Sequence, residues 1–127
     1  MNLKEMMLQY LKEEGFCPKE DEFTIDFKCE GRNYAFFYDE DDDQYFRLMM
    51  PNIYEVTDEN REAVLRALNE TNSSIKVVKA YTLIPQAVWV GFEVLVDSTP
   101  VLADLVPRGL KMLRAAQNKF YEEIQQG

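Results

Sequence analysis

The chain has 127 residues, of which 46% are hydrophobic, so one domain spanning residues 1–127 can bury a full core without metal or disulfide cross-links. Its 14 basic and 23 acidic residues give a net charge of −9, which argues against binding to the phosphate backbone of nucleic acids. The chain contains no histidine, and this excludes Ser-His-Asp and Cys-His catalysis together with histidine-ligated zinc or haem. We therefore expect a non-enzymatic binding module without a cofactor.

The two cysteines, Cys17 and Cys29, are too few for a disulfide scaffold, and neither belongs to a CxxC pair that would suggest a metal site. Charged residues interrupt the first 15 positions, and no later run approaches the ~20 apolar residues that cross a bilayer. These features predict a cytoplasmic protein with neither a signal peptide nor a membrane contact.

The N-terminal segment has the apolar spacing of an amphipathic helix that ends at Gly15. Its apolar stripe consists of Leu3, Met6, Met7, Tyr10 and Leu11. Leu8 lies away from this stripe, and we expect it to be an exposed apolar residue. Methionine is common on adaptable binding surfaces, so the stripe could serve as a pliable groove as well as ordinary core.

Residues 23–29 alternate apolar and polar side chains, and a turn at residues 31–33 joins them to an aromatic strand at residues 34–38. The acidic run Asp39–Asp43 contributes −5 to the net charge and predicts a solvated loop. It begins with the spacing of a calcium loop, but Gln44 and Met50 stand where that motif needs Gly and Glu, so we expect no metal there. A third strand at residues 45–50 would end at Pro51 and Asn52.

Thr57 is expected to cap a second helix that ends within residues 69–73, with Val64, Ala67 and Leu68 facing inward. A second hairpin follows, with strands at residues 75–84 and 88–96 and a break at Pro85 and Gln86.

The register of this hairpin is open at the level of sequence. Lys79 lies opposite Glu93 if the loop has three or five residues, and opposite Phe92 if it has two or four. Because Pro85 cannot adopt the positive φ of a two-residue turn, we favour the pairing of Lys79 with Glu93.

The C-terminal segment is predicted to be helical, with Ser98 or Thr99 as its cap and Pro100 in its first position. Pro107 is expected to break or kink this helix. The following face would pack inward through Leu110, Leu113, Ala116, Phe120 and Ile124. The basic residues Arg108, Lys111 and Arg114 are interpreted as a solvated face or as partners for the surplus carboxylates.

The fold class that follows is α+β, in the order α-β-β-β-α-β-β-α, with a five-stranded, mainly antiparallel sheet that helices cover on one face. Three helices cover only one face of such a sheet well. Trp89 and Leu95 on the other face could then form an interface with a second copy of the chain or with a peptide.

The segment LNETNSSIKVVKAYTLIPQAVWVGFEVLVDSTP, followed by LKMLRAAQNKFYEEI, resembles the bacterial YbjN family, which is described as a family of sensory transduction regulators. The matching features are Asn69 and Asn72 at the end of a helix, the Val-rich hairpin and the closing helix. That family is similar in fold to the class I type III secretion chaperones, including the Tir chaperone group, which are small acidic dimers. The chaperones hold an extended client segment across the first helix and the sheet, which a YbjN-like protein need not do. The resemblance suggests a homodimer, and it supplies no catalytic residues.

These observations predict a module that holds a partner polypeptide on apolar surface. The site that we predict from the sequence consists of Met6, Met7, Leu8, Tyr10, Trp89 and Leu95. A small-ligand-sensing domain is the alternative, and it would require an enclosed apolar pocket where the polypeptide binder requires an open strip.

Overall fold

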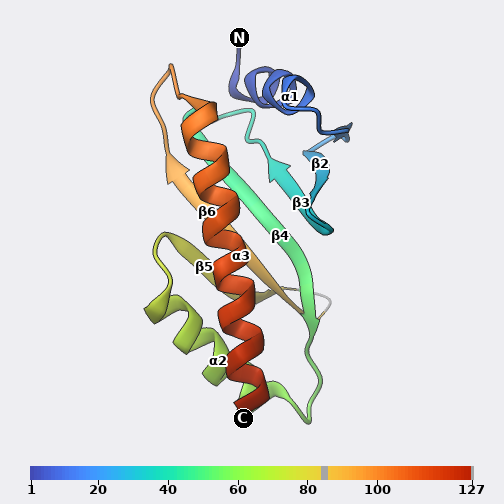
Figure 1. The fold of residues 1–127 in the computed structure, drawn as a ribbon, viewed down its shortest axis with the longest axis vertical. Coiled ribbons are helices and arrows are strands. Elements are labelled where there is room, and N and C mark those ends of the chain that lie inside the picture. Colours follow the sequence, from blue (N-terminus) through green and yellow to red (C-terminus); the bar gives the residue numbers. More distant parts are fainter. Residues whose placement is uncertain (84–85, 127) are drawn as a thin grey trace.

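The computed structural model describes residues 1–83 and 86–126, which fold into three helices and six strands (Figure 1). In chain order the elements are α1 (Leu3–Glu13), β1 (Lys19–Glu20), β2 (Thr24–Cys29), β3 (Arg32–Phe37), β4 (Tyr45–Glu55), α2 (Arg61–Ser74), β5 (Val78–Leu83), β6 (Ala87–Leu95) and α3 (Leu102–Gln126). The predicted α+β class is confirmed, and the sheet has one strand more than predicted.

All six strands form one antiparallel sheet in the order β1-β2-β3-β4-β6-β5. The strand that sequence analysis missed is β1, whose two exposed residues pair with β2 at Lys19↔Asp26 and Glu20↔Ile25. Two residues are too few for apolar alternation to show. Strands β4 and β6 pair with each other within this sheet, although they come from distant parts of the chain.

The three helices contribute to one hydrophobic core on one face of the sheet, and α3 lies along β4 and β6 in Figure 1. Helix α1 buries Leu3, Met7 and Leu11 in this core, as the spacing of its apolar stripe predicts. The sheet contributes aromatic and branched residues, among them Phe27, Phe36, Phe46, Leu48, Val90 and Phe92.

Strand β4 does not end at Pro51 and Asn52, and this part of the prediction is wrong. It runs on to Glu55 after a bulge, where the register with β6 shifts between Met50↔Val90 and Tyr54↔Val88. The bulge tolerates proline, which cannot donate a hydrogen bond to a ladder. Asn52 has a φ of 51°, a left-handed conformation that asparagine adopts more readily than most residues.

Neither predicted register of the second hairpin occurs, because Lys79 pairs with Gly91. The register is shifted by two residues from the favoured one, so that Lys79 and Glu93 still lie on the same face. Their side chains form a diagonal ion pair of 2.8 Å. The predicted strand end at Ile84 and the break at Pro85 lie outside the described residues.

The helix boundaries also differ from the prediction. Thr57 does not begin α2. It exchanges two hydrogen bonds with Asn60 in the turn just before the helix. Helix α3 begins at Leu102, beyond Ser98, Thr99 and Pro100, so these residues are neither its cap nor its first position.

Pro107 lies inside α3 without ending it, so of the predicted break or kink the break is wrong and the kink stays a prediction. Its ring removes the N–H that would bond to the carbonyl of Ala103. Both residues are exposed, so water can replace the missing donor. The neighbouring Val106 is fully buried in the core and holds this turn of the helix against the sheet.

Candidate functional site

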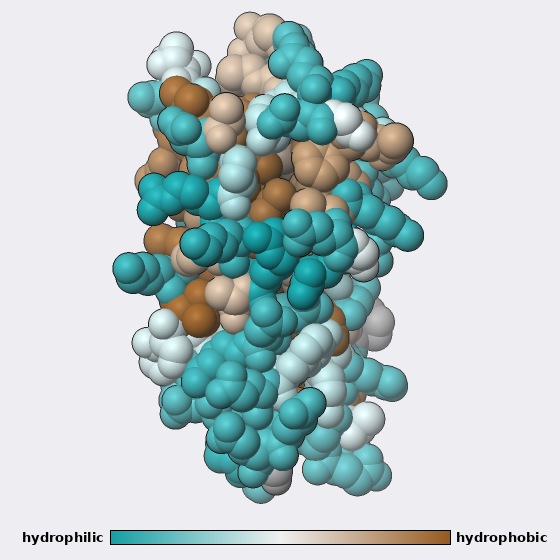
Figure 2. All heavy atoms as spheres, in the orientation of Figure 1, coloured by the Kyte–Doolittle hydropathy of each residue, from teal (hydrophilic) through white to brown (hydrophobic). Residues whose placement is uncertain are grey.

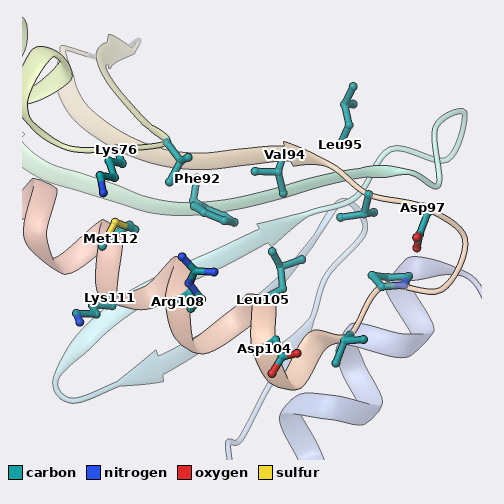
Figure 3. A pocket seen from close by; sticks show the side chains of 14 residues that line it. Lys76, Phe92, Val94, Leu95, Asp97, Asp104, Leu105, Arg108, Lys111 and Met112 are labelled. Atoms are coloured by element: carbon teal, nitrogen blue, oxygen red, sulfur yellow. The ribbon is translucent and has the colours of Figure 1, made fainter.

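An open groove of about 680 Å³ lies between the end of β6 and the N-terminal half of α3 (Figure 3). Its walls come from the segment before β5, from β6 and the residues that follow it, and from α3. The lining residues are Lys76, Val77, Phe92, Val94, Leu95, Val96, Asp97, Pro100, Val101, Asp104, Leu105, Arg108, Lys111 and Met112.

The groove exists because β6 is longer than its neighbour β5. The ladder between the two strands ends at Val78↔Phe92, whereas β6 continues to Leu95 and remains paired with β4 on its other side. Val77 has a φ of 57°, so the chain turns away from the strand direction immediately before β5. Among residues 1–83 and 86–126, no strand pairs with the outer edge of residues 93–95.

Apolar side chains form the floor and the rim of the groove. In Figure 3 the side chains of Phe92 and Val94 point from β6 toward α3, and Leu105 points back toward them. Val101 is 61% exposed at the rim, whereas the 81% exposed side chain of Leu95 points away from α3 in Figure 3. Figure 2 shows apolar residues at the surface mainly in the upper half of this face, whereas α2 and the C-terminal half of α3 present a hydrophilic surface.

Gly109 allows α3 to approach the sheet beneath the groove. A Cβ atom at this position would lie 3.1 Å from Cδ1 of Phe92, which is closer than ordinary contact. Because glycine has no Cβ, the Phe92 ring packs against the helix backbone. This close packing fixes the distance between the floor of the groove and its α3 wall.

The groove carries opposite charges at its two ends (Figure 3). Lys76, Arg108 and Lys111 lie at the end where β5 begins, and Asp97 and Asp104 lie at the other end. In the described part of the chain, none of the three basic residues forms an ion pair with a carboxylate. Arg114, the third residue of the basic stretch predicted from the sequence, pairs with Glu30 at 3.9 Å.

Unlike the edge of residues 93–95, the outer edge of β5 is occupied by a side chain. The Asn72 side chain on α2 donates to the carbonyl of Ala80 at 3.0 Å and accepts from its N–H at 2.7 Å. The backbone groups of β5 at this position are therefore satisfied by a side chain, and this discourages pairing with another strand. The sheet edge is thus blocked at Ala80 of β5. It is open at residues 93–95 of β6, beyond the start of β5.

On the sheet face opposite the helices, side chains of neighbouring strands pack against one another. Met49 is fully buried there and lies over Gly91, and Trp89 packs beside Phe37 and donates to Asn52. Arg47 stacks on Phe37 with its guanidinium carbon 4.7 Å from the ring centroid.

Glu93 is the centre of a polar cluster on this same face. Its side chain is only 13% exposed, and it contacts Lys79, Arg47 and the hydroxyl of Tyr45. Burial raises the pKa of the Glu93 carboxyl above its ordinary value. The exposed ammonium of Lys79 offsets this cost only in part, because water screens it.

No protein-family model matches the chain, and a comparison with the curated proteins gives no match. Several solved structures are similar in fold, among them the following two. One is an uncharacterized protein from Methanothermobacter thermautotrophicus, with a TM-score of 0.71 and 16% identity over 98% of this chain and 97% of that one. The other is YbjN from E. coli, described as a candidate transcription regulator, with a TM-score of 0.62 and 14% identity over 97% of this chain and 89% of that one. The chain has a YbjN-like fold.

This identification confirms the resemblance seen in the sequence at the level of the fold. At 14% and 16% identity the two structures establish the architecture alone. The expected likeness to the type III secretion chaperones stays a prediction, as does the homodimer.

The six residues predicted from the sequence do not form one surface of the YbjN-like fold. Met7 is 0% exposed, and Met6, Leu8 and Tyr10 are partly buried against the core. Trp89 lies on the opposite face of the sheet. Leu95 alone lines the groove. Leu8, expected to be exposed, is only partly exposed, and a binding role for the residues of α1 stays a prediction.

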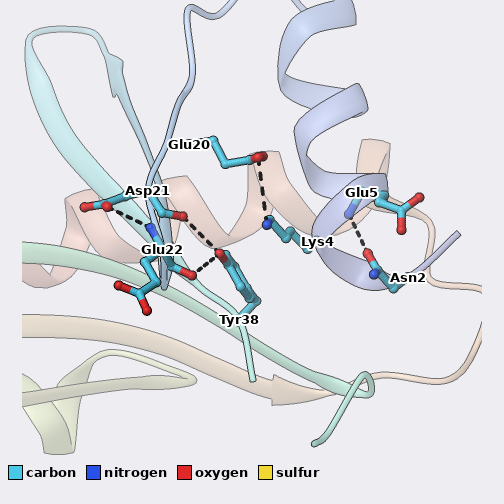
Figure 4. A network of polar contacts seen from close by, with 7 residues as sticks. All are labelled: Asn2, Lys4, Glu5, Glu20, Asp21, Glu22 and Tyr38. Atoms are coloured by element: carbon cyan, nitrogen blue, oxygen red, sulfur yellow. Dashed lines mark hydrogen bonds and ion pairs between the residues drawn. The ribbon is translucent and has the colours of Figure 1, made fainter. Parts of the chain in front are cut away.

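Helix α1 is attached to the edge of the sheet by polar contacts around Tyr38 (Figure 4). The Lys4 ammonium lies 4.5 Å from the Tyr38 ring centroid and 3.8 Å from a carboxylate oxygen of Glu20. The Tyr38 hydroxyl donates to the carbonyls of Asp21 and Glu22. These contacts occupy the side of α1 that faces β1.

The acidic loop also supports α1, because the Asp43 carboxylate accepts a hydrogen bond of 2.7 Å from the N–H of Leu3 in the first turn of the helix.

The described residues contain no group of three or more potential metal ligands. Cys17 and Cys29 are both free thiols. Within the same residues, no helix is both long enough and apolar enough to cross a bilayer.

The groove is not evident from the sequence because it arises from the unequal lengths of β5 and β6. Both strands were predicted to be long, and a hairpin with equal strands leaves no free edge. The usable signals were the apolar residues Val94, Val96, Val101 and Leu105 together with the basic pair Arg108 and Lys111. Their proximity depends on the path of α3, which the predicted break at Pro107 concealed.

Proposed function

We propose that this protein is a non-enzymatic polypeptide-binding module that takes an extended segment of a partner into the groove between β6 and α3. The segment adds to the sheet as a further strand along the outer edge of residues 93–95. The observation that carries the proposal is this free strand edge lying over an apolar floor.

Strand addition suits the groove because its two sources of affinity are both present. Main-chain groups at the edge bind the backbone of the incoming segment, and pockets for alternate side chains give specificity. Every second side chain of an added strand would face the apolar floor formed by Phe92, Val94 and Leu105.

The form of the groove favours a polypeptide over a small ligand. A small-molecule site is usually concave and buries most of its ligand, whereas this groove has an unpaired strand edge, at residues 93–95, along one wall. The described role of YbjN as a candidate regulator is compatible with action through a bound partner.

The proposal can be tested with two libraries of random ten-residue peptides, one displayed with free C-termini and one with its C-termini fused to the carrier. Peptides selected on the wild-type protein are then tested against Val101→Asp and Leu105→Glu. Leu65→Glu is the matched control, because Leu65 is 54% exposed on α2 and lies outside the groove. We expect the two groove variants to lose binding about tenfold or more and the control to retain it.

Hydrogen exchange provides a structural measurement that does not depend on the variants. A peptide that adds as a strand should protect the amide of Leu95, which lies at the outer edge beyond the β5 ladder. If no selected peptide protects this amide, or if Leu65→Glu reduces binding as much as Val101→Asp does, the proposal is wrong.

A second copy of the chain is the competing occupant of the same edge. Sedimentation velocity at micromolar concentration distinguishes the two cases. If the protein is dimeric and the Leu95 amide is protected without peptide, the edge is used for self-association and the proposed function fails.

A further inference from the structure

The groove has a blocked end, and this restricts what an added strand can do. Strand β5 occupies the outer edge of β6 from Val78 onward, so a segment lying beside residues 93–95 meets Val77 and can extend no further along the edge. At that point the segment must leave the sheet or end. This constraint, together with the proposed function on which it rests, allows the identity of the bound end to be inferred.

The charges of the groove distinguish the two possible directions of the segment. A strand antiparallel to β6 runs in the direction of β5, and its C-terminal end meets Val77. A strand parallel to β6 would place its N-terminal end there. The basic residues Lys76, Arg108 and Lys111 surround this end of the groove, so they attract a carboxylate and repel an ammonium group.

The opposite end of the groove favours the same direction. Asp97 and Asp104 lie where the preceding part of an antiparallel segment would enter. They would attract a basic side chain upstream and repel an acidic one. The charges at both ends of the groove thus favour a segment antiparallel to β6, although the protein as a whole has a net charge of −9.

We propose that the groove binds the free C-terminus of a partner polypeptide. The last residues lie as an antiparallel strand beside residues 93–95, and the terminal carboxylate lies among Lys76, Arg108 and Lys111. Alternate apolar side chains of the segment face Val94 and Leu105. A basic residue is favoured upstream, beside Asp97 and Asp104.

The carboxylate can be tested directly with the peptides that the free-C-terminus library selects. Each is synthesised as the free acid, as the C-terminal amide and with two glycines added after the last residue, and its affinity is measured by fluorescence anisotropy. We expect the amide to bind about tenfold or more weakly than the acid, a factor that corresponds to ~1.4 kcal/mol. The extended peptide should also bind more weakly, since Val77 blocks its path.

Charge variants of the protein test whether the basic residues of the groove cause the preference for the free acid. The triple variant Lys76→Gln, Arg108→Gln, Lys111→Gln should bind acid and amide equally. The control triple variant Lys12→Gln, Lys28→Gln, Arg66→Gln changes the net charge by the same amount outside the groove and should keep the preference for the acid. All six residues lie at the surface, so we expect both proteins to fold.

The outcomes separate this inference from the proposed function. If acid, amide and extended peptides bind equally while still depending on Leu105 and protecting Leu95, the groove binds internal segments and the C-terminal inference is wrong. If only the library with fused C-termini yields binders, the same conclusion holds. If neither library yields a groove-dependent binder, both proposals fail.

Discussion

The side chain of Asn72 forms both of its hydrogen bonds with Ala80 through the same amide group, using its oxygen for the N–H and its nitrogen for the carbonyl. It thereby takes the place that a neighbouring strand would occupy beside β5. The helix that carries Asn72 is thus joined to the sheet edge by backbone-like hydrogen bonds as well as by apolar contacts.

Replacing Asn72 with alanine should lower the free energy of unfolding by about 1–2 kcal/mol, because two partly buried hydrogen bonds are lost. Urea denaturation measures this change. The freed edge should also make the variant associate at high concentration, which sedimentation velocity detects. Asn69→Ala on the same helix is the control, and an equal loss of stability there would contradict the role of Asn72.

Gly91→Ala should destabilise the protein by about 1–3 kcal/mol through overpacking. The added Cβ atom would lie 2.7 Å from Sδ of Met49, whose side chain is fully buried and has little room to move. In a Met49→Ala background the added methyl group should cost far less, because the space is vacated. A double-mutant cycle in urea tests this coupling, and additive effects of the two substitutions would refute the contact.

Glu93 should make stability depend on pH in an identifiable direction. Because burial raises its pKa in the folded state, the folded protein binds more protons than the unfolded chain between the ordinary value of 4.5 and the raised value. The contribution of Glu93 to stability is therefore fully present below pH 4.5 and is lost as the pH rises through the raised pKa.

Measuring unfolding of wild type and Glu93→Gln between pH 4 and 7 isolates this effect. The wild type should lose stability relative to the variant as the pH rises, and the exposed control Glu59→Gln should show no such trend. The variant also loses the ion pairs with Lys79 and Arg47, and this shifts its free energy of unfolding by an offset. The decisive quantity is therefore the slope, against pH, of the difference in free energy of unfolding between wild type and variant. A slope of the opposite sign would contradict the raised pKa.

Met7 and Leu95, both predicted from the sequence to contact a partner, should respond to substitution in opposite ways. Met7→Ala should lower the free energy of unfolding by about 2–5 kcal/mol, since it removes a fully buried side chain. Leu95→Asp should change it by less than about 0.5 kcal/mol, because the side chain is 81% exposed. Comparable losses in the two variants would contradict their placement.

The local elements of this fold follow closely from the sequence. The apolar stripe of α1 places Leu3, Met7 and Leu11 in the core, and alternation along β2 buries Ile25 and Phe27. These patterns depend on the spacing of apolar residues within a single helix or strand, which can be read from a short stretch of sequence.

What the sequence did not predict depends on contacts between distant elements. The continuity of α3 through Pro107 relies on the burial of Val106 against the sheet, and local propensity predicts a break there. The two-residue shift of the second hairpin keeps Lys79 and Glu93 on one face, so side-chain chemistry alone does not distinguish the registers. Of the candidate site, Leu95, Arg108 and Lys111 stand out in the sequence, but no pattern of adjacent residues shows that they lie together in the fold.

The pairing of β4 with β6 has a consequence for the order in which this chain is expected to fold. Strands β4 and β6 are separated by the whole of α2 and β5, whereas only a few residues of the sequence separate β2 from β3 and β5 from β6. Short loops cost less entropy to close, so we expect the hairpins to form before the pairing that joins them. Until that pairing forms, both edges of β6 near Leu95 are unpaired, and the nascent chain is at its most prone to aggregation.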